Sequence, residues 1–447
     1  MSRIHDLRSY MDVLDDAGRL TRISHPCDLT HELANVMASV TRQLGSATLI
    51  EHPAGSPWPV FGGALGNQAL AALALECDPA EVTEVMGRAL EPANALPPEE
   101  VKGAAWKDNV RVEDDVNLRK LPIPTHGLHD GGPFITGGVT VAQDPVSGRG
   151  NLSYNRMQVL GPRTLGFNVN EWRHVMRFYK VREAEGEPLE IAVAIGLDPA
   201  IMIAAGARYE DDELLIAGAL RGVRVPVSRG VTVDVLVPAE AEIVVEGYLA
   251  PHERRAEGPL AEFHGYYGEL WESPVFHVTA ICHRDVPIYQ TIVPGGAEHI
   301  YLGNVLPREP LLLRFARHVS KGVTDLHIPP YSNGFSAIVQ LEKTNPGEPK
   351  NVALAAMTAH VNVKKVIVVD PDVDIYDPAD VLWALTNRVD WGRDLFTVPG
   401  AQGHEMDPTA DTRGVHTKIG IDATYKPERR EYGERIRYPE VDLSDYL

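Results

Sequence analysis

Two groups of side chains in this chain have types and an order along the sequence that could perform chemistry. The first group combines an amide, an imidazole and a carboxylate: Asn151, His174 and Glu246. Oxygen-rich ligands mixed with one nitrogen suit a cation such as Mn²⁺ or Mg²⁺ better than Zn²⁺. Each residue alone is more often structural, and the spacing is too long for a local metal motif. The group is a candidate metal site only if the fold brings its members together.

The second group combines a guanidinium with two carboxylates: Arg156, Glu257 and Glu262. A carboxylic acid can protonate a carbon atom near neutral pH if burial or a neighbouring carboxylate raises its pKa, while an arginine keeps a second carboxylate ionised. The spacing of the two glutamates does not place them on one face of a strand, but Gly258-Pro259 permits an irregular turn that could bring both inward. The alternative is a pair of solvated loop charges.

The composition is that of an ordinary folded protein with about three domains. The chain has 447 residues, of which 44% are hydrophobic and 23% are charged, and domains average roughly 150 residues. The formal net charge of −20 would repel phosphate backbones, which disfavours nucleic acid as a partner. An anionic substrate would need a local positive pocket, for which the candidates are Arg156, Arg173, His299 and Arg308.

Three features indicate a cytoplasmic location. No apolar run approaches the roughly 20 residues that a membrane helix needs, and the first residues lack the apolar segment of a secretory signal. Cys27, Cys77 and Cys282 lie far apart and form neither a disulfide framework nor a zinc motif, which fits a reducing compartment. We therefore expect no membrane partner.

The apolar pattern predicts helices near the N-terminus and mainly strands in the centre of the chain. A helix is expected from Ile4 to about Leu14, and Asp78-Pro79 is typical of the start of a helix that runs to Leu90. Between residues 110 and 300, short runs rich in Val, Ile and Thr alternate with Gly and Pro turns, which indicates a mostly antiparallel sheet or barrel. The expected strands lie at 138–142, 191–195, 231–237, 243–245 and 275–281.

The last part of the chain alternates strands and helices. A helix over 309–319 is expected to link it to the barrel, and strands at 335–341 and 366–370 alternate with helices at 349–360 and after Asp377. This order implies a small α/β unit. We expect an N-terminal α/β domain at 1–105, a central sheet domain at 106–305, a linking helix at 306–325 and a C-terminal α/β domain at 326–447.

Two local motifs are rejected as binding sites. Asp370, Asp372 and Asp374 begin like a calcium-binding loop, but the sixth position is Ile375 instead of glycine and the twelfth lacks a glutamate, so a strand end followed by a helix cap is the better interpretation. The segment 61–66, Phe-Gly-Gly-Ala-Leu-Gly, lacks the glycine order of a dinucleotide-binding loop.

The two chemical groups, taken in order with further motifs, resemble the UbiD family of decarboxylases. The stretch Asn151-Leu-Ser-Tyr-Asn-Arg156-Met-Gln followed by Arg173-His174 carries the resemblance, together with Glu257-Gly-Pro-Leu-Ala-Glu262. Segments at 121–136, 242–247, 307–309 and 366–370 fit the family in the same order. The resemblance therefore covers most of the chain.

This resemblance implies a cofactor, prenylated FMN, and residues that hold it. In the family, the positions matching Asn151, His174 and Glu246 bind a manganese-type ion that bridges the protein and the flavin phosphate, and K⁺ is a further expected cation. The position matching Glu262 is the proton donor, and those matching Glu257 and Arg156 complete its network. Three further residues are expected to face the cofactor: Ser153, Met157 and Arg173.

One departure from the family concerns Arg173, because the family commonly has glutamine there. A second concerns a family lysine that reaches the flavin phosphate. It aligns near Thr358, and Lys364 or Lys365 could replace it.

The resemblance also implies a fold and an assembly. A flavin-reductase-like split barrel is expected in the centre and a dimerisation domain at the C-terminus. We expect a homodimer or a hexamer of dimers, with a flavin prenyltransferase as the supplier of the cofactor.

The implied reaction is reversible, non-oxidative decarboxylation of an unsaturated or (hetero)aromatic carboxylic acid. The segments 295–303 and 307–309 resemble family members that act on furan or pyrrole carboxylates, with His299 and Arg308 as substrate contacts. Hydroxybenzoates remain an alternative. A flavin-storage protein and a flavin-free metal hydrolase are rival classes, and the storage function would not need the proton donor Glu262.

Overall fold

The computed structural model describes residues 2–429 together with 435, 436, 438, 439, 441, 442, 444 and 446. The chain forms two compact units, residues 1–310 and 311–447. The expected mixture of an N-terminal α/β part, a central curled sheet and a C-terminal α/β part is confirmed. The finer division into four parts stays a prediction.

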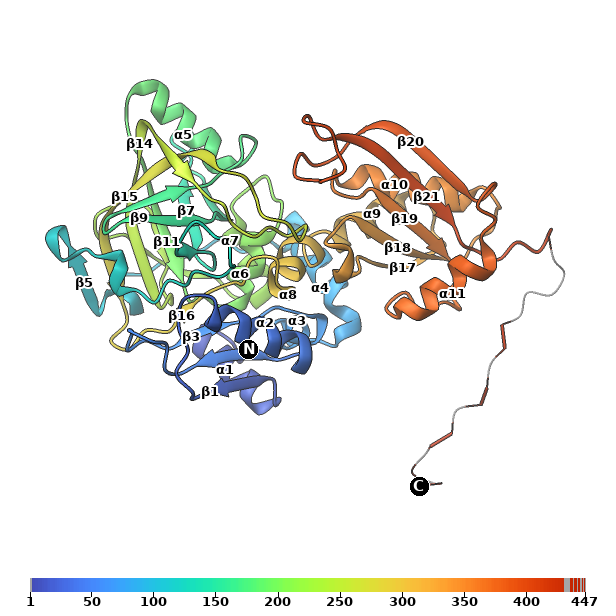
Figure 1. The fold of residues 1–447 in the computed structure, drawn as a ribbon, viewed down its shortest axis with the longest axis horizontal. Coiled ribbons are helices and arrows are strands. Elements are labelled where there is room, and N and C mark those ends of the chain that lie inside the picture. Colours follow the sequence, from blue (N-terminus) through green and yellow to red (C-terminus); the bar gives the residue numbers. More distant parts are fainter. Residues whose placement is uncertain are drawn as a thin grey trace. The chain divides into compact units, whose positions relative to one another are not determined.

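The N-terminal part is a small sheet with helices (Figure 1). Its helices are α1 (Leu7–Asp16), α2 (Glu32–Leu44), α3 (Gln68–Leu75) and α4 (Val82–Ala89). Its strands, in spatial order, are β1 (Leu20–Ile23), β2 (Ala47–Ile50), β3 (Val60–Gly62) and β16 (Tyr289–Gln290). The strand β16 comes from far later in the chain and pairs in parallel with β3, so the N-terminal part and the segment after the central sheet share one sheet.

The helix predicted near the N-terminus is confirmed as α1. Asp6 caps it by accepting a hydrogen bond from the backbone N–H of Ser9, which satisfies a free donor of the first turn. The helix that Asp78-Pro79 predicted begins as a short 3-10 turn at Pro79 and continues as α4.

The central part is a curled sheet of nine strands, all in antiparallel pairs. The strands follow the spatial order β6 (Phe134–Ile135), β9 (Met157–Gly161), β10 (Thr164–Phe167), β15 (Trp271–His283), β14 (Ile243–Glu257), β11 (Leu189–Ile195), β7 (Val139–Gln143) and β8 (Gly150–Tyr154), and β5 (Asn109–Val112) pairs with β15. Its inner face carries a large apolar core that includes Met157, Val193 and Val245. The antiparallel sheet predicted from the Val, Ile and Thr runs is therefore confirmed.

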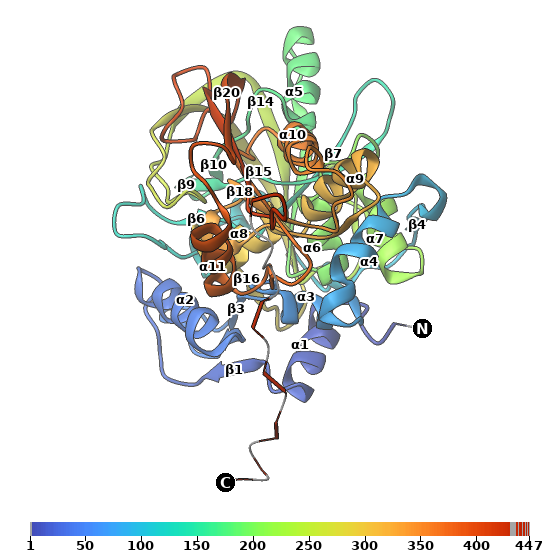
Figure 2. The same cartoon turned by 90° about the vertical axis from the view of Figure 1, so that its right-hand side faces the viewer.

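Helices and a small sheet accompany the central strands. They are α5 (His174–Glu185), α6 (Pro199–Gly206), α7 (Glu213–Arg221) and the strands β4 (Glu99–Glu100), β12 (Pro226–Arg229) and β13 (Leu236–Pro238). Helix α5 lies next to β14 (Figure 2), while α6 and α7 contact β8. The strand predicted at 231–237 is wrong over most of its length, because the backbone N–H groups of Val231 and Thr232 bind a side chain, Glu246, instead of a neighbouring strand.

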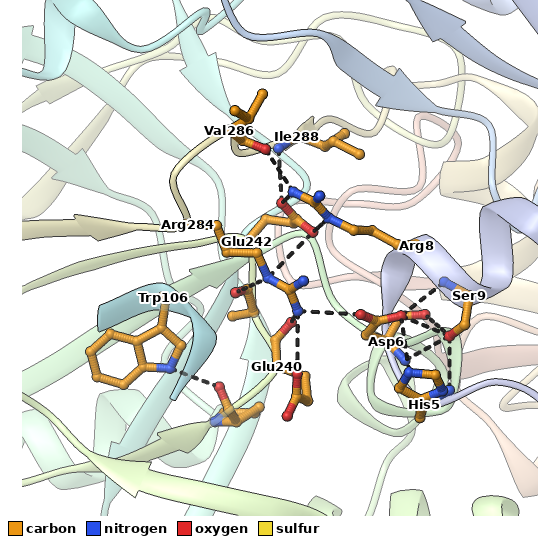
Figure 3. Close-up of polar contacts among 12 residues, drawn as sticks. His5, Asp6, Arg8, Ser9, Trp106, Glu240, Glu242, Arg284, Val286 and Ile288 are labelled. Atoms are coloured by element: carbon orange, nitrogen blue, oxygen red, sulfur yellow. Dashed lines mark hydrogen bonds and ion pairs between the residues drawn. The ribbon is translucent and has the colours of Figure 1, made fainter. Parts of the chain in front are cut away.

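A buried charge cluster fastens α1 to the central sheet (Figure 3). Glu242, at the start of the β14 segment, is fully buried and accepts hydrogen bonds of 2.7 and 2.9 Å from Arg8. Arg284 lies 3.5 Å from the same carboxylate and 3.3 Å from Asp6. Because a buried carboxylate is stable only with such partners, these contacts fix the N-terminal helix on the barrel.

The second unit has a five-stranded sheet in the order β17 (Val323–His327), β18 (Ser336–Leu341), β19 (Lys365–Val369), β21 (Val415–Asp422) and β20 (Leu395–Gln402). Its helices are α9 (Glu309–Val319), α10 (Glu348–Ala359) and α11 (Pro378–Arg388). The predictions for these helices are confirmed, and Asp377 caps α11 through the N–H of Ala379.

The aspartates that begin like a calcium loop have other partners in this unit. Asp370 and Asp372 both pair with Arg388, in accord with the rejection of a calcium site. The helices in the described part of the chain are too short or too polar to cross a bilayer.

Candidate active site

The proton-transfer group predicted from the sequence comes together in the fold. Arg156 follows β8, Glu257 ends β14, and Glu262 lies in the loop beyond it. The Nε and Nη2 atoms of Arg156 donate to the two oxygens of Glu257 at 3.0 and 3.2 Å, and its Nη1 atom donates to Glu262. One guanidinium thus bridges two carboxylates, which are not solvated loop charges: Glu257 is fully buried and the Glu262 side chain is 12% exposed.

The two carboxylates have different environments. Burial raises the pKa of Glu262 to about 7, and the charge of Glu257 adds to this effect, while Arg156 opposes it. Burial also raises the pKa of Glu257, but hydrogen bonds from Arg156, from Asn168 at 2.9 Å and from Ser273 act in the opposite direction. Of the two groups, Glu262 is therefore suited to carry an exchangeable proton near neutral pH.

A buried polar group with metal-ligand character surrounds Asn151. The amide nitrogen of Asn151 lies 3.4 Å from Nδ1 of His174 and donates to both oxygens of Glu213 at 3.0 Å. Its amide oxygen is buried and has no hydrogen-bond partner among the described residues. Burial raises the pKa of Glu213 to about 8. A cation beside the unsatisfied oxygen would stabilise both it and an ionised Glu213.

The predicted third member of that group, Glu246, lies elsewhere, so the fold does not bring the three predicted residues together. Along the paired strands β8, β7, β11 and β14, Glu246 is in one row with Leu152 and Ala192, whereas Asn151 is one residue out of that row. Because alternate residues point to opposite faces of a sheet, Glu246 and Asn151 face opposite sides. The Glu246 carboxylate accepts the backbone N–H groups of Val231 and Thr232 and the Thr232 hydroxyl.

Glu213 is the residue that sequence reasoning missed. It begins α7 directly after the capping residue Asp212, and its carboxylate also accepts the backbone N–H of Leu152 at 2.7 Å. A glutamate in the first helical turn is a common sequence feature, and the run Glu210-Asp-Asp-Glu213 gives no sign of which member is buried. Only the contact between α7 and β8 identifies it.

The residues expected to face a cofactor have mixed surroundings. Ser153 is buried two residues after Asn151 on the same face of β8, and its hydroxyl donates to the side-chain oxygen of Asn155 at 2.9 Å. The hydroxyl of Thr140, which pairs with Ser153 across the strands, is buried and has no hydrogen-bond partner among the described residues. Met157 is fully buried within the inner apolar core. This face therefore offers polar groups beside an apolar wall.

Arg173 is the N-cap residue of α5 and lies over the ring of Trp172. Loss of solvent contact lowers the pKa of its guanidinium, whereas the nearby Glu213 acts in the opposite direction. Arg173 therefore belongs to the same neighbourhood as Asn151 and His174.

His299 and Arg308 were both expected to supply positive charge, and for His299 this is wrong. Burial, Arg156, His264 and Arg308 lower the pKa of His299 to about 4, so the imidazole is neutral near pH 7. The backbone N–H of Gly295 donates to its Nδ1 atom at 3.0 Å, which leaves the ring proton on Nε2. Burial and the charge of Arg173 lower the pKa of Arg308 only to about 9, so it stays a cation.

The lysines suggested for a phosphate contact lie in the second unit. Lys364 donates to both oxygens of Asp407 at 2.8 and 2.9 Å and lies over the ring of Phe335. Lys365 is exposed at the start of β19. Which of them contacts a phosphate stays a prediction.

Family models match the chain over most of its length. The N-terminal, Rift-related and C-terminal domain models of 3-octaprenyl-4-hydroxybenzoate carboxy-lyase match residues 11–90, 99–297 and 301–423. The chain belongs to the UbiD family, and it is an enzyme of the carboxy-lyase class.

Several relatives are similar over nearly the whole chain. The UbiD-class enzyme HmfF of Pelotomaculum thermopropionicum, solved in complex with FMN, is 38% identical with a TM-score of 0.94, and the alignment covers 99% of this chain and 100% of that one. An evolved dimeric form of HmfF in complex with prFMN is 36% identical with a TM-score of 0.90 and covers 99% and 100%. The 3,4-dihydroxybenzoic acid decarboxylase AroY of Klebsiella pneumoniae is 31% identical with a TM-score of 0.93 and covers 99% of both chains.

A further relative is named for a different substrate. The anhydromevalonate phosphate decarboxylase of Methanosarcina mazei is 38% identical over 336 residues, which are 74% of this chain and 77% of that one.

Proposed function

We propose that this protein decarboxylates an unsaturated or (hetero)aromatic carboxylic acid with prenylated FMN, and that Glu262 protonates the carbon from which CO₂ leaves. The observation that carries the proposal is the bridge from Arg156 to Glu257 and Glu262. It ties together two buried carboxylates, of which Glu262 has a pKa raised to about 7 by burial. A general acid with such a pKa is half-protonated near neutral pH and can give up and regain its proton in each cycle.

The residues divide the work of the reaction. Arg156 orients both carboxylates, and Asn168 adds a hydrogen bond that helps to keep Glu257 ionised. Burial of this network excludes water that would otherwise compete for the proton. In the carboxylation direction the same Glu262 would act as the base, by microscopic reversibility.

The cofactor would be held beside Asn151, His174 and Glu213. These groups fit a divalent cation of the manganese type, because they offer two oxygen donors and one nitrogen, with one amide oxygen unsatisfied. Ser153, Met157 and Arg173 would line the same region. When bound, prenylated FMN would supply the electron sink for decarboxylation. The K⁺ ion stays a prediction.

The substrate class we favour is a furan- or pyrrole-type acid with a second anionic group. Arg308 would hold that group as a cation, and His299 would donate a hydrogen bond from Nε2 without adding charge. The segments 295–303 and 307–309, which resemble family members that act on furan or pyrrole carboxylates, favour this class over a hydroxybenzoate. The second candidate is an unsaturated acid that carries a phosphate, favoured by the name of the Methanosarcina relative.

The proposal includes a homodimer or larger assembly and a flavin prenyltransferase as the cofactor supplier. Its test is a panel of carboxylic acids assayed for CO₂ release by protein co-expressed with such a prenyltransferase. The panel should include furan-2,5-dicarboxylate, pyrrole-2-carboxylate, a hydroxybenzoate and a phosphorylated unsaturated acid. The absence of a flavin spectrum from the co-expressed protein would overturn the proposal. Release of CO₂ from the hydroxybenzoate alone would keep the reaction but replace the substrate class.

A further inference from the structure

The glycine-rich segment 61–66, which fits no dinucleotide-binding motif, has a specific partner in the fold. It leaves β3 and turns so that its backbone N–H groups face a carboxylate. Gly63 donates to Oε2 of Glu298 at 2.8 Å, and Leu65 donates to Oε1 at 3.0 Å. Glu298 is 3% exposed. The segment is therefore a carboxylate-binding loop whose ligand belongs to the chain itself.

The geometry of this loop explains its glycines. Gly63 has a φ of +76°, a conformation that side chains disfavour, and a Cβ atom there would lie 2.6 Å from the Thr41 hydroxyl. At Gly62, a Cβ atom would lie 2.7 Å from the carbonyl oxygen of Thr291. The loop can approach the segment around Thr291 because Gly62 lacks a side chain, and it can turn beside Thr41 because Gly63 lacks one.

The residue that the loop holds immediately precedes His299. Both belong to the short helix α8 (Ala297–Ile300). The chain enters this helix from β16, which is paired with β3, and the N–H of Thr291 donates to the carbonyl of Phe61 at 2.9 Å. The glycine-rich loop therefore contacts the segment before α8 through its backbone and α8 itself through Glu298.

We propose that Glu298, held by the N–H groups of Gly63 and Leu65, is a positioning residue that fixes α8 and thereby presents the Nε2–H of His299 to the substrate. The inference rests on the proposed role of His299 as a substrate contact. Two hydrogen-bonded contacts set the position of the His299 ring. The Gly295 N–H donates to Nδ1 of the ring, and the Glu298 carboxylate, one residue earlier, accepts from the loop. Without the contact between Glu298 and the loop, helix α8 could rotate or shift, and Nε2 of His299 would move relative to Arg156.

The test replaces Glu298 by glutamine, which keeps the size of the side chain. One loop N–H would then face an NH₂ group instead of an oxygen, so α8 should shift. The matched control is Tyr10→Phe, because the Tyr10 hydroxyl donates to the carbonyl of Ala64 at 2.7 Å in the same loop, and its second hydrogen bond goes to the carbonyl of Leu70 instead of to Glu298. Thermal unfolding of both variants shows whether they lose comparable stability.

The first readout needs neither substrate nor turnover. In holoenzyme with ¹⁵N-labelled histidine, the ring signals of His299 are assigned by their loss in His299→Ala. We expect Glu298→Gln to move these signals and Tyr10→Phe to leave them in place. Unchanged His299 signals in a folded Glu298→Gln protein would overturn the proposal. Glu298→Asp, which retracts the carboxylate, is the second variant if the glutamine protein does not fold, with the same shift expected.

The second readout is kinetic. Glu298→Gln should raise KM about tenfold, roughly the loss of one hydrogen bond to the substrate, with a smaller effect on kcat and with full flavin occupancy. In a His299→Ala background the same substitution should change KM less than about twofold, because the two residues act through one contact. Additive effects would refute the positioning role. If no acid is turned over at all, the proposed function fails, while the His299 signals still decide the role of Glu298.

Discussion

Replacing Glu262 by glutamine tests the central step of the proposed reaction. Glutamine keeps the shape of the side chain and can still accept the hydrogen bond from Arg156, but it has no carboxylic proton to donate. General acid catalysis typically contributes at least about 10²-fold. At 1.36 kcal/mol for each factor of ten, this loss raises the barrier by about 2.7 kcal/mol. Flavin occupancy should persist, because Glu262 lies in the acid network and not in the Asn151 group.

The pH dependence sharpens the same prediction. With a pKa of about 7, Glu262 is mostly protonated below pH 7 and mostly ionised above it. The decarboxylation rate at saturating substrate should therefore fall about tenfold per pH unit above the pKa. In Glu262→Gln this alkaline limb should vanish. In Glu257→Gln it should move to lower pH, because the negative charge of Glu257 raises the pKa of Glu262.

The assay is CO₂ release over a series of pH values, with exchange of deuterium at the reacting carbon as a second measure. Exchange should fall in parallel with turnover, because both need the same proton. Near-wild-type decarboxylation by Glu262→Gln with bound prenylated FMN would refute the reasoning and assign the proton to another residue. If the decarboxylation rate of Glu262→Gln still falls above pH 7 as in the wild type, the reasoning is also refuted.

Three further outcomes are expected. His174→Ala and Glu213→Gln should each lose metal and flavin together, measured by metal analysis and absorption spectra, whereas Glu246→Gln should retain both; the reverse pattern would restore the first metal assignment. Arg308→Ala should raise KM for furan-2,5-dicarboxylate by about 10- to 150-fold, the equivalent of a charged contact of roughly 1.5–3 kcal/mol, and much less for the matching monoacid; equal losses on both would indicate a structural role. Glu242→Gln should lower the free energy of unfolding, measured by urea titration, by roughly 2–3 kcal/mol. This is less than usual for a broken buried ion pair, because the Arg8 side chain is 42% exposed. A change below about 0.5 kcal/mol would show that the cluster does not hold α1 on the central sheet.

The local elements could be predicted from the sequence because their signals are local. Helix α11 follows an Asp-Pro cap, helix α9 has the predicted bounds 309–319, and the antiparallel strands of the centre follow runs of β-branched residues. The exception is the segment 231–237. Its β-branched residues favour a strand, but the buried Glu246 takes up the N–H groups at its start.

The acid network was predictable for a different reason. Arg156, Glu257 and Glu262 are recognisable by the motifs around them, and the structure brings all three together. That the pKa of Glu262 is raised to about 7 could not be read from the sequence. The shift follows from burial, to which the nearby charge of Glu257 adds, and both exist only in the folded protein.

The sequence by itself determined the family, the order of the elements and the identity of most candidate residues, since all of these depend on residue types and on spacing along the chain. The tertiary structure alone decided which carboxylate stands beside Asn151, because strand pairing turns Glu246 to the opposite face and the contact of α7 with β8 brings Glu213 in. It also decided that His299 is neutral, because burial and neighbouring cations act only once distant segments meet. The tertiary structure likewise decided that the glycine-rich loop binds Glu298, because the pairing of β3 with β16 brings these distant segments together.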